Sequence, residues 1–136
     1  MKKLIRTIAV AAVLIATNLS TFAAPPASVI QKVKSQVETI SNYLPSEAGY
    51  GLTLTQVRYD SSTYSIVYKY QYYLPVNTPT KAAIAEVKQS MIHMLKANPN
   101  GEDMQFIKSG ITFHYRYYSS DGEFLYSIKI TPSDVR

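Results

Sequence analysis

The sequence predicts an α+β domain in which two αββ units form a four-stranded antiparallel sheet, with two main helices packed on one face. Three observations support this fold class. Apolar residues recur at helical spacing in two segments, they alternate with polar residues in four others, and turn-forming residues separate these segments. The predicted order is helix, strand, strand, helix, strand, strand.

Residues 1–23 have the pattern of a cleavable Sec-type signal peptide. A cationic start precedes the apolar run 8–16, which is far shorter than the ~20 residues of a membrane-spanning helix. Thr21 and Ala23 place small residues at −3 and −1 for cleavage after Ala23. We therefore expect a periplasmic or secreted protein that has no integral membrane insertion once the signal is removed.

Residues 24–136 are expected to form a single α+β domain, long enough to hold a core without covalent staples. The chain has no cysteine, which excludes disulfides, thiolate metal sites and thiol nucleophiles. Three of the 14 basic residues leave with the signal peptide, so 11 basic residues stand against 9 acidic ones, a net charge of +2. This mild charge, without a basic run, argues against nucleic-acid binding.

Two amphipathic segments predict the helices. The first helix is expected from Val29 to Leu44, after an N-cap at Ser28, with an apolar stripe of Ile30, Val33, Val37, Ile40 and Leu44. The second is expected over Lys81–Ala97, after a cap at Thr78, with a stripe of Ile84, Val87, Met91, Met94 and Leu95. One or two further helical turns are expected over Glu102–Lys108.

Four segments with period-two alternation predict the strands: 52–59 with a bulge at Gln56, 64–74, 111–117 and 124–130. The stretch SEAGYG (46–51) is expected to be a loop, and SSDG (119–122) a hairpin turn. The halves 28–74 and 78–131 share the order helix, strand, strand, which raises the hypothesis of a structural repeat.

Tyrosines occupy the apolar phase of these strands, and the segment YSIVYKYQYY alone holds five. Two helix stripes cannot cover every apolar-phase position on four strands, so part of this aromatic surface is expected to face solvent and bind a partner. The first predicted binding residues, Tyr70, Tyr72 and Tyr73, are expected to extend past the hairpin. The others, which are expected on the face opposite the helices, are His114, Arg116 and Tyr118. Tyr126 is expected to share a face with Phe124.

No catalytic residue, metal ligand or cofactor is predicted. His93 and His114 lack metal-ligand spacing, and the sequence has no G-x-S-x-G elbow. Glu102 and Asp103 at the start of a helical turn are explained by the helix dipole. These absences favour a protein that is not an enzyme.

The sequence thus predicts an exported, non-enzymatic interaction protein whose tyrosine-rich sheet docks a macromolecular partner, expected to be another exported or envelope protein. One alternative is an inhibitor or immunity protein that blocks a secreted enzyme with a projecting loop, either 46–51 or 119–122. Another is a small apolar-ligand carrier with a pocket lined by tyrosine and methionine, including Met91, Met94 and Met104. The oligomeric state is left open.

Overall fold

A computed structural model describes residues 24–136, and the predicted signal peptide lies outside the described residues. The described chain is an α+β fold with three α-helices and a five-stranded mixed sheet. The helices are α2 (Ala27–Ser41), α3 (Lys81–Ala97) and α4 (Glu102–Lys108). The strands are β1 (Ser46–Gly49), β2 (Leu52–Asp60), β3 (Ser65–Tyr72), β4 (Thr112–Tyr118) and β5 (Phe124–Ile130). A short 3₁₀ helix, η1 (Pro132–Val135), follows β5.

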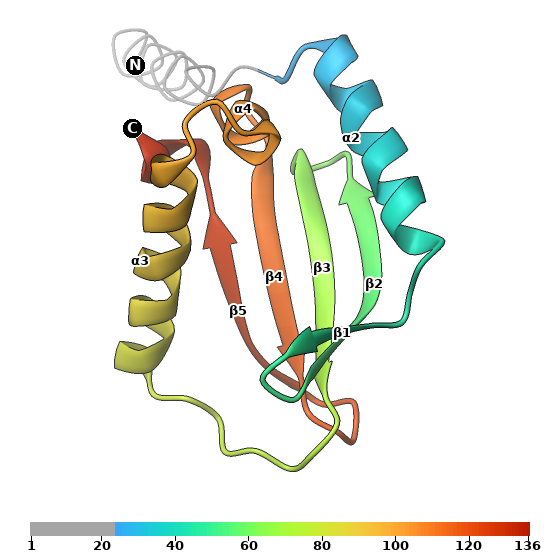
Figure 1. The fold of residues 1–136 in the computed structure, drawn as a ribbon, viewed down its shortest axis with the longest axis vertical. Coiled ribbons are helices and arrows are strands. Elements are labelled where there is room, and N and C mark those ends of the chain that lie inside the picture. The colour runs from blue at the N-terminus through green and yellow to red at the C-terminus, as the bar shows by residue number, and fades with distance from the viewer. Residues whose placement is uncertain (1–23) are drawn as a thin grey trace, which may run out of the picture.

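The sheet has the order β1-β2-β3-β4-β5, and its central pair, β3 and β4, is parallel (Figure 1). The expectation of an antiparallel sheet is therefore wrong at this pair. The 17 residues of α3 rise about 26 Å and return the chain to the end of the sheet where β3 began. Because β4 starts from that end, it runs alongside β3 in the same direction, as strands joined by a helical crossover do.

The expectation that 46–51 is a loop is also wrong, because Ser46–Gly49 forms the edge strand β1. Backbone pairing with β2, from Ser46 opposite Leu54 to Gly49 opposite Leu52, makes this strand. All four of its residues are exposed, so no apolar alternation marks it in the sequence. The fifth strand could therefore not be found from periodicity.

Bulges interrupt the alternation at two places. The first lies in β2 between Leu54 and Gln56, where the sequence predicted it. The second separates Tyr118, which pairs with Phe124, from Tyr117, which pairs with Tyr126. Leu125 is the extra residue, and Phe124 consequently lies on the opposite face from Tyr126. The expectation that these two rings share a face is wrong because a bulge reverses the phase of the residues beyond it.

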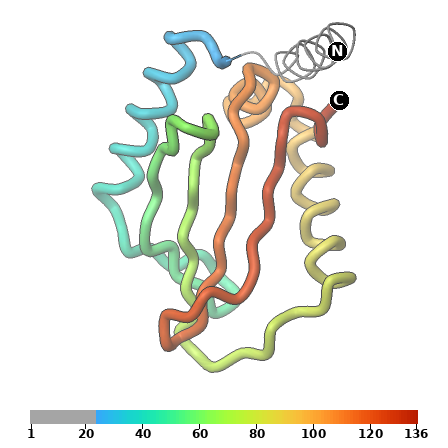
Figure 2. Tube along the Cα trace, turned by 180° about the vertical axis from the view of Figure 1, so that it is seen from behind, coloured from blue at the N-terminus to red at the C-terminus, as the bar shows by residue number. Residues whose placement is uncertain are grey.

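Helices α2 and α3 lie over opposite edges of the sheet. Figure 1 shows α2 beside β2 and α3 beside β5, with the central strands visible between them, and Figure 2 shows the same strands from behind. Both helices serve one core, because Val33 of α2 and Ile92 of α3 are buried with Phe113 of β4. The prediction that both helices pack on one face therefore agrees with the structure.

The helix stripes are shifted relative to the sequence prediction. Val29, rather than Ile30, packs on the core from α2, which ends at Ser41. In α3 the buried residue is Ile92, which lies outside the predicted stripe, whereas Val87 and Met94 are exposed. The N-cap of α3 is Thr80, whose hydroxyl accepts the Ala83 N–H at 3.1 Å, and not Thr78.

The C-terminal turn is held by Asp134. Its carboxylate accepts the Thr131 N–H at 2.8 Å and the Thr131 hydroxyl at 3.1 Å, and it lies 3.4 Å from Nζ of Lys88 in α3. Burial tends to raise the pKa of Asp134, but the hydrogen bonds from Thr131 and the Lys88 charge outweigh it and hold that pKa below its ordinary value.

The Asp134→Ala substitution is expected to lower the free energy of unfolding by about 1 kcal/mol at pH 7, which is typical for the loss of a cap. Because the pKa of Asp134 is lower in the folded state than in the unfolded state, its charge stabilises the fold above the unfolded-state pKa of about 3.9. This stabilisation is lost as the pH falls through the folded-state pKa. The difference between wild type and variant in urea unfolding should therefore shrink below about pH 4. Asp121→Ala, in the exposed β4–β5 turn, is the control. A difference that stays constant with pH would contradict the role of the charge.

Candidate functional site

Six tyrosines form a ladder on the helix side of β3, β4 and β5: Tyr68, Tyr70, Tyr72, Tyr115, Tyr117 and Tyr126. The register of the strands places these side chains on the same face of the sheet, because Tyr68 pairs with Tyr115 and Tyr70 with Tyr117. Stacked rings join the strands, with centroid distances of 4.9 Å for Tyr68–Tyr115 and 5.4 Å for Tyr70–Tyr117. The Tyr117 and Tyr126 rings stack at 4.5 Å, and the Tyr72 and Tyr126 hydroxyls are 2.7 Å apart. The ladder is a rigid aromatic surface.

The ladder is only partly covered. Tyr117 is buried, while the other five rings pack against the core and remain partly exposed. This follows from the position of the helices, which lie over the edges of the sheet and leave its centre between them. The sequence predicted that the helices would not cover every apolar-phase position on the strands, and this arrangement agrees with that prediction.

Five tyrosines of the ladder have a raised pKa and stay uncharged at physiological pH. Burial is the main cause that raises the pKa values of Tyr68, Tyr70, Tyr115 and Tyr117, and for Tyr68 the Asp103 charge adds to it. Burial also raises the pKa of Tyr126, with the hydrogen bond to Tyr72 as the next cause. The floor between the helices is therefore a neutral surface that presents aromatic carbon and phenolic hydroxyls.

Two apolar side chains of α3 are left uncovered. Val87 is 46% exposed and Met94 is 71% exposed. Met91, one turn from each of them, packs against the core cluster. The space bounded by α2, α3, α4 and the tyrosine ladder is called the trough below. Single exposed apolar residues are ordinary, but Met94 lines this space together with Tyr115 of the ladder.

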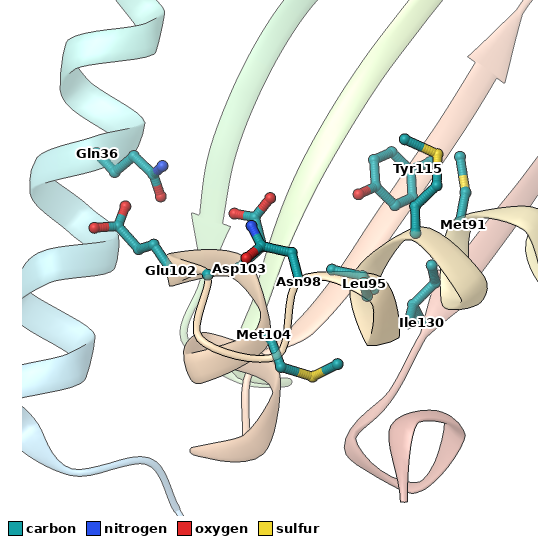
Figure 3. A pocket seen from close by; sticks show the side chains of 11 residues that line it. Gln36, Met91, Leu95, Asn98, Glu102, Asp103, Met104, Tyr115 and Ile130 are labelled. Carbon is teal, nitrogen blue, oxygen red and sulfur yellow. The ribbon is translucent and has the colours of Figure 1, made fainter.

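A cavity of about 370 Å³ occupies the α4 end of the trough. Figure 3 shows Gln36 of α2 and Glu102 of α4 pointing toward one another, and Met91 beside the Tyr115 ring. Asp103 also lines this cavity, and burial, followed by the neighbouring Glu102, raises the pKa of its carboxyl. The trough thus combines an aromatic floor and a methionine-rich wall with an acidic end.

The predicted binding residues divide between the two faces of the sheet. Tyr70 and Tyr72 belong to the ladder in the trough. The expectation that they extend past the hairpin is wrong, because Leu54 pairs with Tyr70 and Leu52 with Tyr72. The bulge in β2 lets this strand continue alongside β3 to its end. Tyr73 follows β3, is 57% exposed, and donates its N–H to the Gly51 carbonyl at 3.1 Å.

His114, Arg116 and Tyr118 lie on the face opposite the helices, as their phase predicted. Nε of Arg116 donates to the Tyr118 hydroxyl at 3.0 Å, and the Arg116 guanidinium lies 4.6 Å from the Phe124 ring centroid. The structure therefore brings these three together but separates them from Tyr70 and Tyr72. Sequence reasoning missed the exposure of Val87 because it assigned this residue to the core, and it considered Met94 only as part of a core stripe or of a ligand pocket.

A metal site requires clustered ligands, and a membrane span requires a long apolar helix. Within 24–136 no group of three or more His, Asp or Glu side chains could hold a metal ion. His93 lies exposed on α3. None of the described helices is long and apolar enough to cross a membrane.

Both loops of the inhibitor hypothesis are tight turns. Gly49, Tyr50 and Gly51 join β1 to β2 with positive φ angles, and the Tyr50 side chain at the tip is 99% exposed. The Ser119–Gly122 turn is closed by a hydrogen bond from the Gly122 N–H to the Ser119 carbonyl at 3.0 Å, which agrees with the predicted hairpin. Only the first turn projects an aromatic side chain.

Solved structures with a similar fold include two pilotins of type 2 secretion systems. The pilotin EpsS of Vibrio vulnificus has a TM-score of 0.59 at 12% identity, covering 80% of this chain and 93% of the pilotin. The pilotin AspS of Vibrio cholerae has a TM-score of 0.53 at 18% identity, with coverage of 79% and 92%.

A candidate secreted protein of Pseudomonas aeruginosa has a TM-score of 0.60 at 8% identity, covering 80% of this chain and 94% of that one. At these identities the likeness shows a shared fold. No family model matches the chain, and no curated protein matches it in sequence.

Proposed function

We propose that this protein is an exported, non-enzymatic docking protein that binds an apolar segment of another envelope protein in the trough. The observation that carries the proposal is the partly exposed tyrosine ladder with the uncovered Met94 side chain at its border. Tyrosine and methionine are enriched in protein interfaces, and tyrosine supplies a large contact area at little entropic cost.

The acidic end of the trough adds specificity to this proposal. Glu102 and Asp103 line the cavity at the end formed by α4. A bound segment with apolar side chains along its length and a basic residue at one end would satisfy both features. Of the six predicted binding residues, Tyr70 and Tyr72 belong to this trough in the proposal.

The described fold supports an envelope location. Two of the similar structures are pilotins of type 2 secretion systems and a third is a candidate secreted protein. The predicted signal peptide points the same way. We therefore propose periplasmic or secreted residence for a single domain formed by residues 24–136.

Photo-crosslinking in the native cell tests the docking proposal. A photoreactive residue at Met94, on the trough side of α3, is expected to give a discrete adduct with another envelope protein. The same residue at Glu86, which is exposed on the far side of α3, is the matched control and should give little of that adduct. Equal adducts from both positions, or none from position 94, would contradict the proposal.

A small apolar-ligand carrier is the second candidate. The observation that favours it is the cavity of about 370 Å³, lined in part by Met91, Met94, Met104 and Tyr115. This volume lies in the range of small-ligand pockets. The crosslinking experiment separates the two candidates, because a carrier would yield adducts with the mass of a small molecule at position 94 instead of a protein.

A further inference from the structure

The sheet face opposite the helices carries four cations: Arg58, Lys69, Arg116 and Lys129. We call it the cationic face. In Figure 2 the helices lie to either side of the central strands when the sheet is seen from behind. Register puts these residues on one side, because Lys69 pairs with Arg116, Arg58 with Val67, and His114 with Lys129.

Two of these cations are direct neighbours. Lys69 and Arg116 are partners across the parallel β3–β4 pair. Like charges opposite each other in a sheet destabilise it. No carboxylate of residues 24–136 forms an ion pair with Lys69, Arg116 or Lys129, and the Arg58–Asp60 pair is long, at 3.9 Å. The repulsion between Lys69 and Arg116 is therefore not neutralised by an ion pair with any carboxylate of the described residues.

The charge is concentrated on this side of the molecule. Residues 24–136 carry a net charge of +2, and on the cationic face four cations stand against the two carboxylates of Asp60 and Glu47. The remaining surface is thus neutral overall. Asp121 and Glu123 lie in the β4–β5 turn, beyond the ring of Phe124, and form no ion pair with the cationic face among the described residues.

His114 lies at the centre of the cationic face, where the neighbouring charges affect its pKa. Its Nε2 atom is buried and has no hydrogen-bond partner among the described residues. Burial is the main cause that lowers the pKa of His114, and the charges of Lys129, Arg116 and Arg58 lower it further, against a small opposing effect of Asp60. A neutral histidine here is consistent with a positive local potential.

Aromatic rings hold the two central cations in place. Nζ of Lys69 lies 4.8 Å from the Tyr118 ring centroid, and the Arg116 guanidinium lies over Phe124. Only Nε of Arg116 donates a hydrogen bond within the described chain, to the Tyr118 hydroxyl. The outer N–H groups of the guanidinium remain available for the bidentate pairing that carboxylates favour.

We infer that the cationic face binds an extended acidic polypeptide segment with carboxylates at alternate positions. The cations form two rows across the strands, one with Lys69 and Arg116 and the other with Arg58 and Lys129. These rows are two residues apart along each strand, a distance of roughly 6.6 Å. Alternate side chains of an extended chain have the same spacing, so successive carboxylates would meet successive rows.

An anionic membrane surface fits this face less well. Interfacial binding requires apolar groups that enter the lipid. Tyr118 and Phe124 pack edge-on at a centroid distance of 5.6 Å, and the cations of Lys69 and Arg116 lie over these rings. Both rings are therefore in contact with each other and with these cations, although Phe124 is 48% exposed.

Binding of two synthetic peptides to residues 24–136 tests this inference. One nine-residue peptide alternates Thr and Glu, and the matched peptide alternates Thr and Gln. We expect the Glu peptide to bind at least about tenfold more tightly at low ionic strength, with an affinity that falls as salt is added. Fluorescence anisotropy of labelled peptides measures both affinities.

Variants locate the binding surface. Lys69→Gln combined with Arg116→Gln should weaken Glu-peptide binding about tenfold. The matched pair Lys32→Gln and Lys96→Gln, which removes the same charge from exposed helix positions, should leave binding unchanged. Arg116→Lys should weaken binding less than Arg116→Gln does, because it keeps the charge but loses the planar fork that pairs with a carboxylate. Circular dichroism and a thermal melt of each variant verify folding.

Three results would overturn the inference. The first is equal loss of binding in the helix variants, because it would mean attraction to net charge alone. The second is equal affinity for the Glu and Gln peptides. The third is co-sedimentation with phosphatidylglycerol vesicles that requires Lys69 and Arg116 when the Glu peptide fails to bind, which would assign the face to lipid headgroups. The inference does not depend on what occupies the trough.

Discussion

The Phe113→Ala variant is expected to lose about 3–5 kcal/mol of the free energy of unfolding. Phe113 is 1% exposed and is among the largest fully buried side chains of the described chain. Its ring meets Tyr68 and Tyr115 edge-on, at centroid distances of 6.2 and 6.4 Å. Truncation would therefore leave a cavity beneath the ladder and remove two aromatic contacts.

Urea unfolding followed by circular dichroism measures this loss. Phe124→Ala is the matched control, because it removes the same ring from a side chain that is 48% exposed. The control should cost no more than about 1 kcal/mol, mainly the contact with Arg116. Equal losses in both variants would show that Phe113 does not hold the centre of the core.

The Val33→Asp variant is expected to detach α2 from the sheet. Val33 is fully buried and is the buried residue of this helix. An unpaired carboxylate in that position would lose its hydration without gaining a partner, at a cost of several kcal/mol. Because α2 forms one wall of the trough, the variant should also lose the crosslink from position 94.

Ser35→Asp is the control for this variant. It adds the same charge to the same helix at an exposed position and should change stability by less than about 0.5 kcal/mol. Protease susceptibility of the α2 segment and urea unfolding distinguish local detachment from global unfolding. A Val33→Asp protein that unfolds like Ser35→Asp would contradict the packing of α2.

Alternation in the sequence was sufficient to place most strands and their faces. It correctly assigned Tyr70 and Tyr115 to the apolar phase and His114 and Arg116 to the opposite one, because period two is a local property of extended backbone. It failed where that property is interrupted. Because of the bulge at Leu125, Phe124 lies on the opposite face of the sheet from Tyr126, and no residue type in the sequence marks this bulge.

The site required the tertiary structure for a different reason. Helical periodicity marks an apolar stripe but does not say how much of it a sheet covers, so Val87 and Met94 were assigned to the core. Their exposure depends on where α3 lies over β5. The hypothesis of a repeat between 28–74 and 78–131 stays a prediction.

The sequence by itself determined the order of the helices and of the strands β2 to β5, the absence of cysteine chemistry and an excess of aromatic residues in the apolar phase, because each depends only on residue identity and local spacing. The tertiary structure decided three further features: the parallel β3–β4 pair, the edge strand β1 and the opening between α2 and α3. The physical reason is that strand direction, edge pairing and helix placement arise from contacts between residues far apart in the chain. Neither propensity nor periodicity encodes such contacts.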